Sequence, residues 1–143
     1  MRTSEICINA IKGFEGCELE SYQDSVGIWT IGWGHTKEVS PNQSISLTQA
    51  EEYLKSDLVP CELAINRLIH SPLTQWQFDA CVSLSYNIGI GNFTRSTLLS
   101  LIQKGGISQA SREFLRWDKA EGKTLPGLTT RRNWEMKRFL NLI

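Results

Sequence analysis

The sequence predicts an α+β fold in which a small β-hairpin lobe precedes a larger helical lobe. Residues 17–34 carry many aromatic and β-branched side chains around a turn-prone DSVG segment, which is typical of a hairpin. From residue 48 onward, capping sequences and apolar spacings typical of helices follow one another. With 143 residues, 41% of them apolar, the chain is long enough for one compact domain.

The first part of the chain combines a helix with the hairpin. Residues 4–13 place apolar side chains near helical spacing, and Gly13 is a stop signal for this helix. Asp24 suits the hairpin turn because its side chain can bond to nearby backbone groups. Gly27 tolerates a positive φ in the same turn.

Helix signals dominate the rest of the chain. A capping box at residues 48–51 precedes a helical run that reaches about residue 70, and Pro60 is expected to break or kink it. A second capping box at residues 74–77 precedes an almost wholly apolar run, which predicts the central core helix. Further helical segments are expected at residues 96–106, 108–117 and 131–142.

These elements predict one domain over residues 1–143. Its β lobe is expected at about residues 14–58 and its helical lobe at about residues 70–143, with helix 1–13 packed on the helical lobe. A cleft is expected between the lobes. No stretch approaches the roughly 20 apolar residues of a membrane-spanning helix, and the N-terminus lacks the apolar run of a secretory signal. We therefore expect a protein made in a cytoplasm, without membrane insertion.

Charge is balanced overall but not along the chain. Residues 1–57 hold nine acidic and four basic side chains, whereas residues 58–143 hold six acidic and eleven basic ones. A basic face attracts polyanions such as wall polymers. A nucleic-acid partner is not expected, because no groove-reading motif is present.

The cysteines and histidines do not predict a metal site. Cys7, Cys17, Cys61 and Cys81 have neither the spacing of a zinc ribbon nor that of a CxxC redox pair. Free, buried thiols are expected, and a disulfide is the alternative if the protein works in an oxidising compartment. The sequence predicts no metal and no cofactor.

Glu15, Asp24 and Thr30 are the candidate residues for chemistry. Hydrolysis of a glycosidic bond needs an acid that protonates the leaving group and a second carboxylate across the sugar. Glu15 follows the first helix beside apolar Phe14, whereas Asp24 lies in the exposed hairpin turn. Such unlike environments favour an acid role for one carboxyl and a base role for the other. Thr30, on the returning strand, could hydrogen-bond the attacking water.

The run GFEGCELESYQDSVGIWTIGWGHT resembles the catalytic region of phage-type lysozymes, the endolysins of T-even and lambdoid phages. Two later runs, SYNIGIGNFTRSTLL and LRWDKAEGKTLPGLTTRR, resemble the family's core helix with its cleft loop and its C-terminal signature. The resemblance covers nearly the whole chain. It implies a lysozyme-like fold in which Glu15 is the general acid, Asp24 the base or charge stabiliser, and Thr30 its helper.

The resemblance also implies which residues contact substrate, and one of them, Arg131, corresponds to an arginine that meets the catalytic glutamate. The implied substrate-binding residues are His35, Tyr86, Asn87, Ser96 and Arg131.

These observations predict a lysozyme that hydrolyses the β-1,4 bond between N-acetylmuramic acid and N-acetylglucosamine in peptidoglycan. We expect a monomer that is made in the host cytoplasm and acts on glycan strands of the wall after release through a holin-type membrane pore. Two alternatives stay open. A lytic transglycosylase would use Glu15 but no water-positioning Asp24, and an inactive wall-binding module would use neither.

Overall fold

The protein divides into two compact units in a computed structural model that describes all of residues Met1–Ile143. Residues Ile8–Val59 form what we call the hairpin unit. Residues Met1–Cys7 and Pro60–Ile143 form the helical unit. The predicted α+β class is confirmed by the elements, which are helices and small antiparallel sheets. The single domain with lobes at about residues 14–58 and 70–143 stays a prediction.

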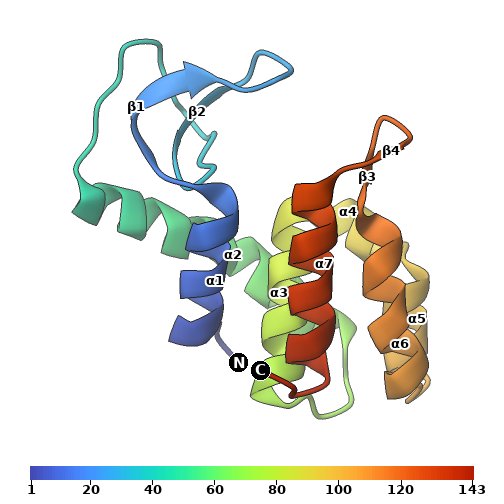
Figure 1. The fold of residues 1–143 in the computed structure, drawn as a ribbon. Helices are drawn as coiled ribbons and strands as arrows, with labels where there is room; N and C mark the ends of the chain where they lie inside the picture. Colours follow the sequence, from blue (N-terminus) through green and yellow to red (C-terminus); the bar gives the residue numbers. More distant parts are fainter. The chain divides into compact units, whose positions relative to one another are not determined.

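The hairpin unit is built around strands β1 (Glu18–Gln23) and β2 (Trp29–Gly32), which pair antiparallel (Figure 1). The register places Tyr22 opposite Thr30 and shows an irregularity between Glu18 and Tyr22. Residues 43–45 then return along β1 through backbone hydrogen bonds. The predicted hairpin is therefore confirmed, and this third segment, which the sequence did not reveal, gives β1 a second neighbour.

Two helices, α1 (Glu5–Glu15) and α2 (Leu47–Leu68), have residues in the hairpin unit. The start predicted for α2 was wrong by two residues, because Ser46 rather than Thr48 caps it by accepting a hydrogen bond from the Gln49 backbone N–H at 3.1 Å. Pro60 lies inside α2 without ending it. The apolar core of the hairpin unit contains Ile11, Ile31, Trp33, Ala50, Leu54 and Leu58.

The helical unit is centred on α3 (Gln75–Ile88), which packs against α7 (Pro126–Phe139) (Figure 1). The capping box predicted for α3 is confirmed, since Thr74 and Gln77 bond to each other's backbone. Residues 78–85 of α3 are all buried, as predicted for the central helix. The remaining elements of the unit are α4 (Ile90–Thr94), α5 (Thr97–Gln103), α6 (Ile107–Glu113), the 3-10 helix η1 (Phe114–Trp117), β3 (Lys119–Ala120) and β4 (Lys123–Thr124).

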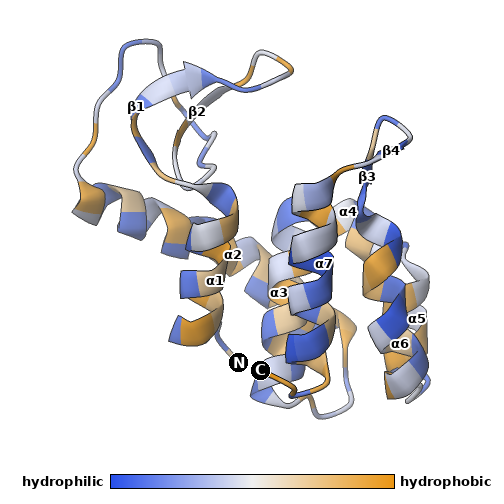
Figure 2. Ribbon diagram, in the orientation of Figure 1, coloured by the Kyte–Doolittle hydropathy of each residue, from blue (hydrophilic) through white to orange (hydrophobic).

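The end of the chain differs from the sequence-based prediction in two ways. Helix α7 begins at Pro126, five residues earlier than expected, because proline fits the first helical position, where no backbone N–H is needed. The segment before α7 forms the short hairpin of β3 and β4, which was expected to be a loop. In Figure 2, α7 carries mostly hydrophilic residues. Several of these are buried, so polar contacts must stabilise them.

Buried ion pairs hold α7 in the helical unit. Arg138 donates to Asp79 Oδ2 from Nη2 at 2.8 Å, and the Asp79 carboxyl is fully buried. Asp79 also accepts hydrogen bonds from the backbone and side chain of Ser4 and from Gln75. The N-terminal segment, α3 and α7 are thereby joined through one carboxylate.

A second buried carboxylate, Glu135, lies on α7 itself. Its Oε1 is 2.9 Å from Nε of Arg132, and its Oε2 is 3.4 Å from Nε of Arg131 and accepts a hydrogen bond from Ser83. Burial raises the pKa of Glu135, while the two arginines and Ser83 lower it. A buried arginine needs such a partner, because an unpaired buried charge is strongly destabilising.

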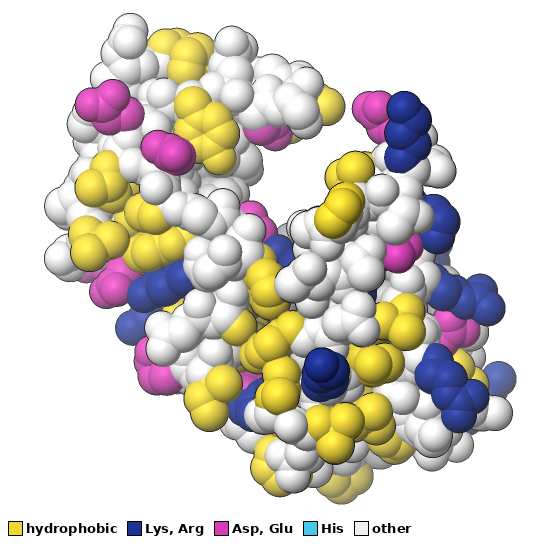
Figure 3. All heavy atoms as spheres, in the orientation of Figure 1, with side chains coloured by type: hydrophobic (Ala, Val, Ile, Leu, Met, Phe, Trp, Pro, Cys, Tyr) yellow, Lys and Arg dark blue, Asp and Glu magenta, His cyan; other side chains and the backbone are white.

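The remaining cations of the helical unit lie mostly at its surface, where Figure 3 shows many Lys and Arg side chains. The exposed ones beyond residue 94 are Arg95, Lys104, Arg112, Arg116, Lys119, Lys123 and Lys137. All four cysteines are free. Three of them are buried, as expected, whereas Cys17 is exposed. None of the helices combines the length and the apolar character needed to cross a bilayer.

Replacing Asp79 tests the first buried network. We expect Asp79→Ala to lower the free energy of unfolding by about 3–5 kcal/mol, because the variant leaves the buried Arg138 charge without its carboxylate. Chemical denaturation followed by circular dichroism measures this loss. As a control, Glu121→Ala changes an exposed residue of the β3–β4 turn and should stay within about 0.5 kcal/mol of the parent. Equal stability of both variants would contradict the role given to Asp79.

Candidate active site

Glu15 is the last residue of α1 and is half-buried. The helix therefore runs two residues beyond Gly13, the stop signal that was predicted to end it. Gly16 ends it instead. Its φ of +68° lets the chain leave the helix toward β1, and its N–H bonds to the Lys12 carbonyl at 3.1 Å. Glu15 thus occupies a fixed helix end immediately before the hairpin.

Asp24 begins the turn between β1 and β2, and its side chain holds that turn. Oδ1 accepts hydrogen bonds from the backbone N–H groups of Val26 at 3.0 Å and Ile28 at 2.9 Å. Its backbone closes the turn as well, with bonds to Gly27 and Ile28. The other carboxylate oxygen, Oδ2, accepts no hydrogen bond from the protein. One oxygen of Asp24 is therefore structural and the other is available.

Thr30 lies in β2 and is buried, with 4% of its surface exposed. Its hydroxyl donates to the Ile28 carbonyl at 2.9 Å, which fixes the rotamer and leaves the oxygen lone pairs free to accept. In the strand register Thr30 lies opposite Tyr22, so the two side chains share one face of the hairpin.

Tyr22 is a residue that the sequence analysis missed. Burial and the negative charges of Glu15, Glu18 and Asp24 raise the pKa of Tyr22. The tyrosine hydroxyl therefore lies within electrostatic reach of both candidate catalytic carboxyls. The signal was present in the sequence, because Tyr22 precedes Asp24 by two residues, which is the spacing of side chains on one face of an extended chain.

His35 is packed inside the hairpin unit. Its Nδ1 lies 2.8 Å from Oδ2 of Asp57, and its ring stacks on Tyr53 with centroids 4.1 Å apart. Only 8% of the residue is exposed. Burial raises the pKa of Asp57, and the hydrogen bond and charge of His35 oppose this rise. Asp57 was not singled out from the sequence, and contact of His35 with substrate stays a prediction.

Three other candidates lie together in the helical unit. Arg131 on α7 donates to the Ser83 carbonyl at 3.0 Å and pairs with Glu135. Asn87, at the end of α3, accepts a hydrogen bond from Arg132 at 2.8 Å, and its neighbour Tyr86 is half-buried. The pairing of Arg131 with Glu15 that the resemblance implies joins residues of different units and stays a prediction.

Ser96 caps α5 by accepting from the Leu99 N–H at 3.1 Å and donating to the Phe93 carbonyl. The simpler, structural role considered for a serine before a helix is thus present. Ser96 also borders a cavity of about 310 Å³ in the helical unit. The other residues lining this cavity are Arg95, Thr97, Leu98, Glu113, Arg116 and Trp117.

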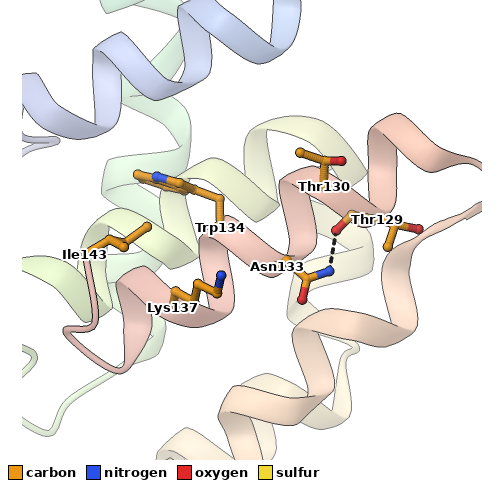
Figure 4. A pocket seen from close by; sticks show the side chains of 6 residues that line it. All are labelled: Thr129, Thr130, Asn133, Trp134, Lys137 and Ile143. Atoms are coloured by element: carbon orange, nitrogen blue, oxygen red, sulfur yellow. Dashed lines mark hydrogen bonds between the residues drawn. The ribbon is translucent and has the colours of Figure 1, made fainter.

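A larger cavity of about 410 Å³ lies along α7 and the C-terminal residue (Figure 4). Within it, the Asn133 side chain donates to the Thr129 carbonyl at 2.9 Å. None of the predicted site residues lines this cavity. Its lining residues are Thr129, Thr130, Asn133, Trp134, Lys137 and Ile143.

The comparison with known proteins decides the family. The phage lysozyme family model matches residues 12–135. The chain belongs to the phage lysozyme family. An endolysin of Acyrthosiphon pisum secondary endosymbiont phage 1 is 43% identical, and its match covers 97% of this chain and 98% of the relative. An endolysin of Bacillus phage PZA is 41% identical, and its match covers 97% of this chain but 55% of the relative.

Solved structures that are similar to this chain agree with the fold. The muramidase domain of SpmX from Asticaccaulis excentricus is 36% identical with a TM-score of 0.91, and 97% of each chain is covered. The endolysin of Escherichia coli O157:H7 phage FAHEc1 is 38% identical with a TM-score of 0.91, and 100% of this chain and 96% of that chain are covered. The predicted lysozyme-like fold and the predicted role as a cell-wall hydrolase are thus confirmed, and the chain is a glycoside hydrolase.

Removal of His35 should change the titration of Asp57 in this phage lysozyme. We expect His35→Phe to raise the pKa of Asp57 further, because the variant keeps a ring beside Tyr53 but loses the two interactions by which His35 lowers that pKa. A carboxyl with a raised pKa makes folding less favourable as the pH rises through the range between its unfolded and folded values. Carbon-detected NMR titration of Asp57 measures the pKa directly, and a lower pKa in the variant would contradict the assignment.

Proposed function

We propose that this phage lysozyme hydrolyses the β-1,4 bond between N-acetylmuramic acid and N-acetylglucosamine, with Glu15 as general acid and Asp24 as general base. One observation carries this proposal. Glu15 ends a helix and Asp24 begins a turn, yet the negative charges of both raise the pKa of the same residue, Tyr22, within one compact unit. Two carboxyls from different elements close to one point are what glycoside hydrolysis requires.

In the proposed reaction Glu15 gives its proton to the glycosidic oxygen as the bond from that oxygen to the anomeric carbon breaks. A water forms the new bond to the anomeric carbon and loses a proton to Asp24. The geometry of Asp24 suits this step, because Oδ1 is held by two backbone N–H groups while Oδ2 accepts none. Thr30 accepts a hydrogen bond from the same water, since its own hydroxyl already donates a hydrogen bond to the Ile28 carbonyl.

Substrate binding in this proposal uses residues of both units. His35, Tyr86, Asn87, Ser96 and Arg131 are the proposed contacts to the glycan strand. Ser96 has the strongest support among them, because it borders a cavity that also offers Trp117 and charged side chains. Sugar sites commonly combine an aromatic face with a few placed polar groups.

We further propose that the protein acts as a monomer on peptidoglycan glycan strands after it is made in a host cytoplasm and released through a holin-type pore. The endolysins among its relatives support a role in the wall. Partners other than peptidoglycan, including nucleic acid and membrane, are not part of this proposal, and neither is a cofactor.

The acid role is tested by Glu15→Gln, with Glu20→Gln as the matched control. Glu20 is an exposed carboxylate in β1, so its loss changes the charge of the hairpin without touching the proposed chemistry. Purified proteins are added to outer-membrane-permeabilised cells, and the fall in turbidity is followed. We expect Glu20→Gln to clear the cells like the parent and Glu15→Gln to lose nearly all activity, by about 10²–10⁴-fold. Equal clearing by both variants would refute the proposal.

The base role separates hydrolysis from transglycosylation. Asp24→Asn keeps the oxygen that accepts the two turn hydrogen bonds but cannot take a proton, so we expect an intact fold and a rate lower by about 10²–10⁴-fold. Mass spectrometry of the parent enzyme's products should show reducing muramic ends. Anhydro ends together with an active Asp24→Asn variant would identify a transglycosylase instead, and binding to peptidoglycan without any product would identify an inactive module.

A further inference from the structure

The phenol hydroxyl of Tyr22 has no hydrogen-bond partner within the protein. Its ring is partly exposed, at 39%, although it lies within a strand of the hairpin unit. Its hydroxyl makes no hydrogen bond with the protein, in contrast to the side chains of Asp24 and Thr30 beside it. A phenol hydroxyl that borders several carboxyls and lacks a partner is available to a ligand.

The strand geometry directs this side chain to the proposed chemistry. Tyr22 lies opposite Thr30 in the register of β1 and β2, and directly opposed residues project from the same face of a sheet. Tyr22 also precedes Asp24 by two residues, which is the spacing of neighbours on one strand face. Tyr22 and buried Thr30 therefore project from one face of the hairpin, and Asp24, directly after β1, has the spacing of that same face.

The charges around Tyr22 determine whether its hydroxyl donates or accepts a proton. Burial raises the pKa of Tyr22, and so do the carboxylates of Glu15, Glu18 and Asp24, so the phenol keeps its proton at neutral pH. A phenol that keeps its proton is a hydrogen-bond donor and not a base. A sugar offers the matching chemistry, because its hydroxyl and amide oxygens accept hydrogen bonds and its C–H face packs on an aromatic ring.

We propose that Tyr22 contacts the sugar at the cleaved bond, donating a hydrogen bond from its hydroxyl to a sugar oxygen while its ring packs on the sugar. Tyr22 is thus a substrate-binding residue of the hairpin unit. This inference rests on the proposed function, since it assigns the sugar bound beside Glu15 and Asp24.

The test compares Tyr22→Phe and Tyr22→Leu with the parent, using soluble peptidoglycan oligosaccharides so that kcat and KM are measured separately. Tyr22→Phe removes only the hydroxyl, and we expect kcat/KM to fall about tenfold. Tyr22→Leu removes the ring as well, and we expect a fall of about a hundredfold. Both variants should keep the parent's circular dichroism spectrum, and the Glu20→Gln variant should keep its kcat/KM.

A pH profile distinguishes contact with substrate from an effect on the carboxyls. If Tyr22 binds the sugar, both limbs of the kcat/KM profile of Tyr22→Phe stay where they are in the parent. A displaced limb would overturn the inference, because Tyr22 would then act through Glu15 or Asp24. Parent-like kinetics of both Tyr22 variants would overturn it too.

The Glu15→Gln variant, measured in the same assay, distinguishes a failure of the Tyr22 contact from a failure of the proposed hydrolysis. If it is inactive while the Tyr22 variants match the parent, the contact fails and the proposed function stands. If it matches the parent, the proposed function itself fails.

Discussion

The hydrogen bonds from the Val26 and Ile28 backbone to the Asp24 carboxylate are the constraint on which the candidate site depends. They close the turn between β1 and β2, and the turn sets the register that places Tyr22 opposite Thr30. A slip of one strand by one residue would turn Tyr22 and Thr30 to opposite faces of the hairpin. The carboxylate thus orders the surface on which it is proposed to act. Its two oxygens divide these tasks, because only Oδ1 serves the backbone.

The helical unit meets a different constraint, which is the burial of charge. Helix α7 brings three buried arginines, Arg131, Arg132 and Arg138, against α3. Two buried carboxylates, Asp79 and Glu135, form ion pairs with these three arginines, and they also accept hydrogen bonds from further donors. Because these cations are paired inside, they do not contribute freely to the surface charge. The attraction of the unit for polyanions therefore depends on the lysines and arginines that remain exposed.

Much of the fold could be predicted from the sequence, because local signals dominate it. The hairpin, the capping box before α3 and the apolar core helix were all predicted from spacing and turn chemistry. The early start of α7 was missed because its first five residues contain Gly127 and two threonines, whose helical propensity is low. The end of α1 was misplaced because Gly13 does not adopt the positive φ that ends a helix, so α1 continues through it to Glu15.

In the candidate site, too, contacts between residues near in sequence could be predicted, whereas a contact between distant residues could not. Glu15, Asp24 and Thr30 were predicted as catalytic residues because the chemistry and the family spacing both point to them. Tyr22 was overlooked although its place on the strand face was readable from its distance to Asp24. Asp57, the partner of His35, could not be found in this way, because the contact joins residues 22 positions apart on different elements.

The central claim is that Glu15 and Asp24 act from opposite sides of one glycosidic bond. A crystal structure of the Glu15→Gln variant with a bound peptidoglycan oligosaccharide measures this most directly. We expect the side chain at position 15 within about 3 Å of the glycosidic oxygen. We also expect Asp24 across the sugar ring, with the two side-chain groups roughly 6.5–9.5 Å apart. An oligosaccharide bound away from these residues, or both groups on one side of the sugar, would contradict it.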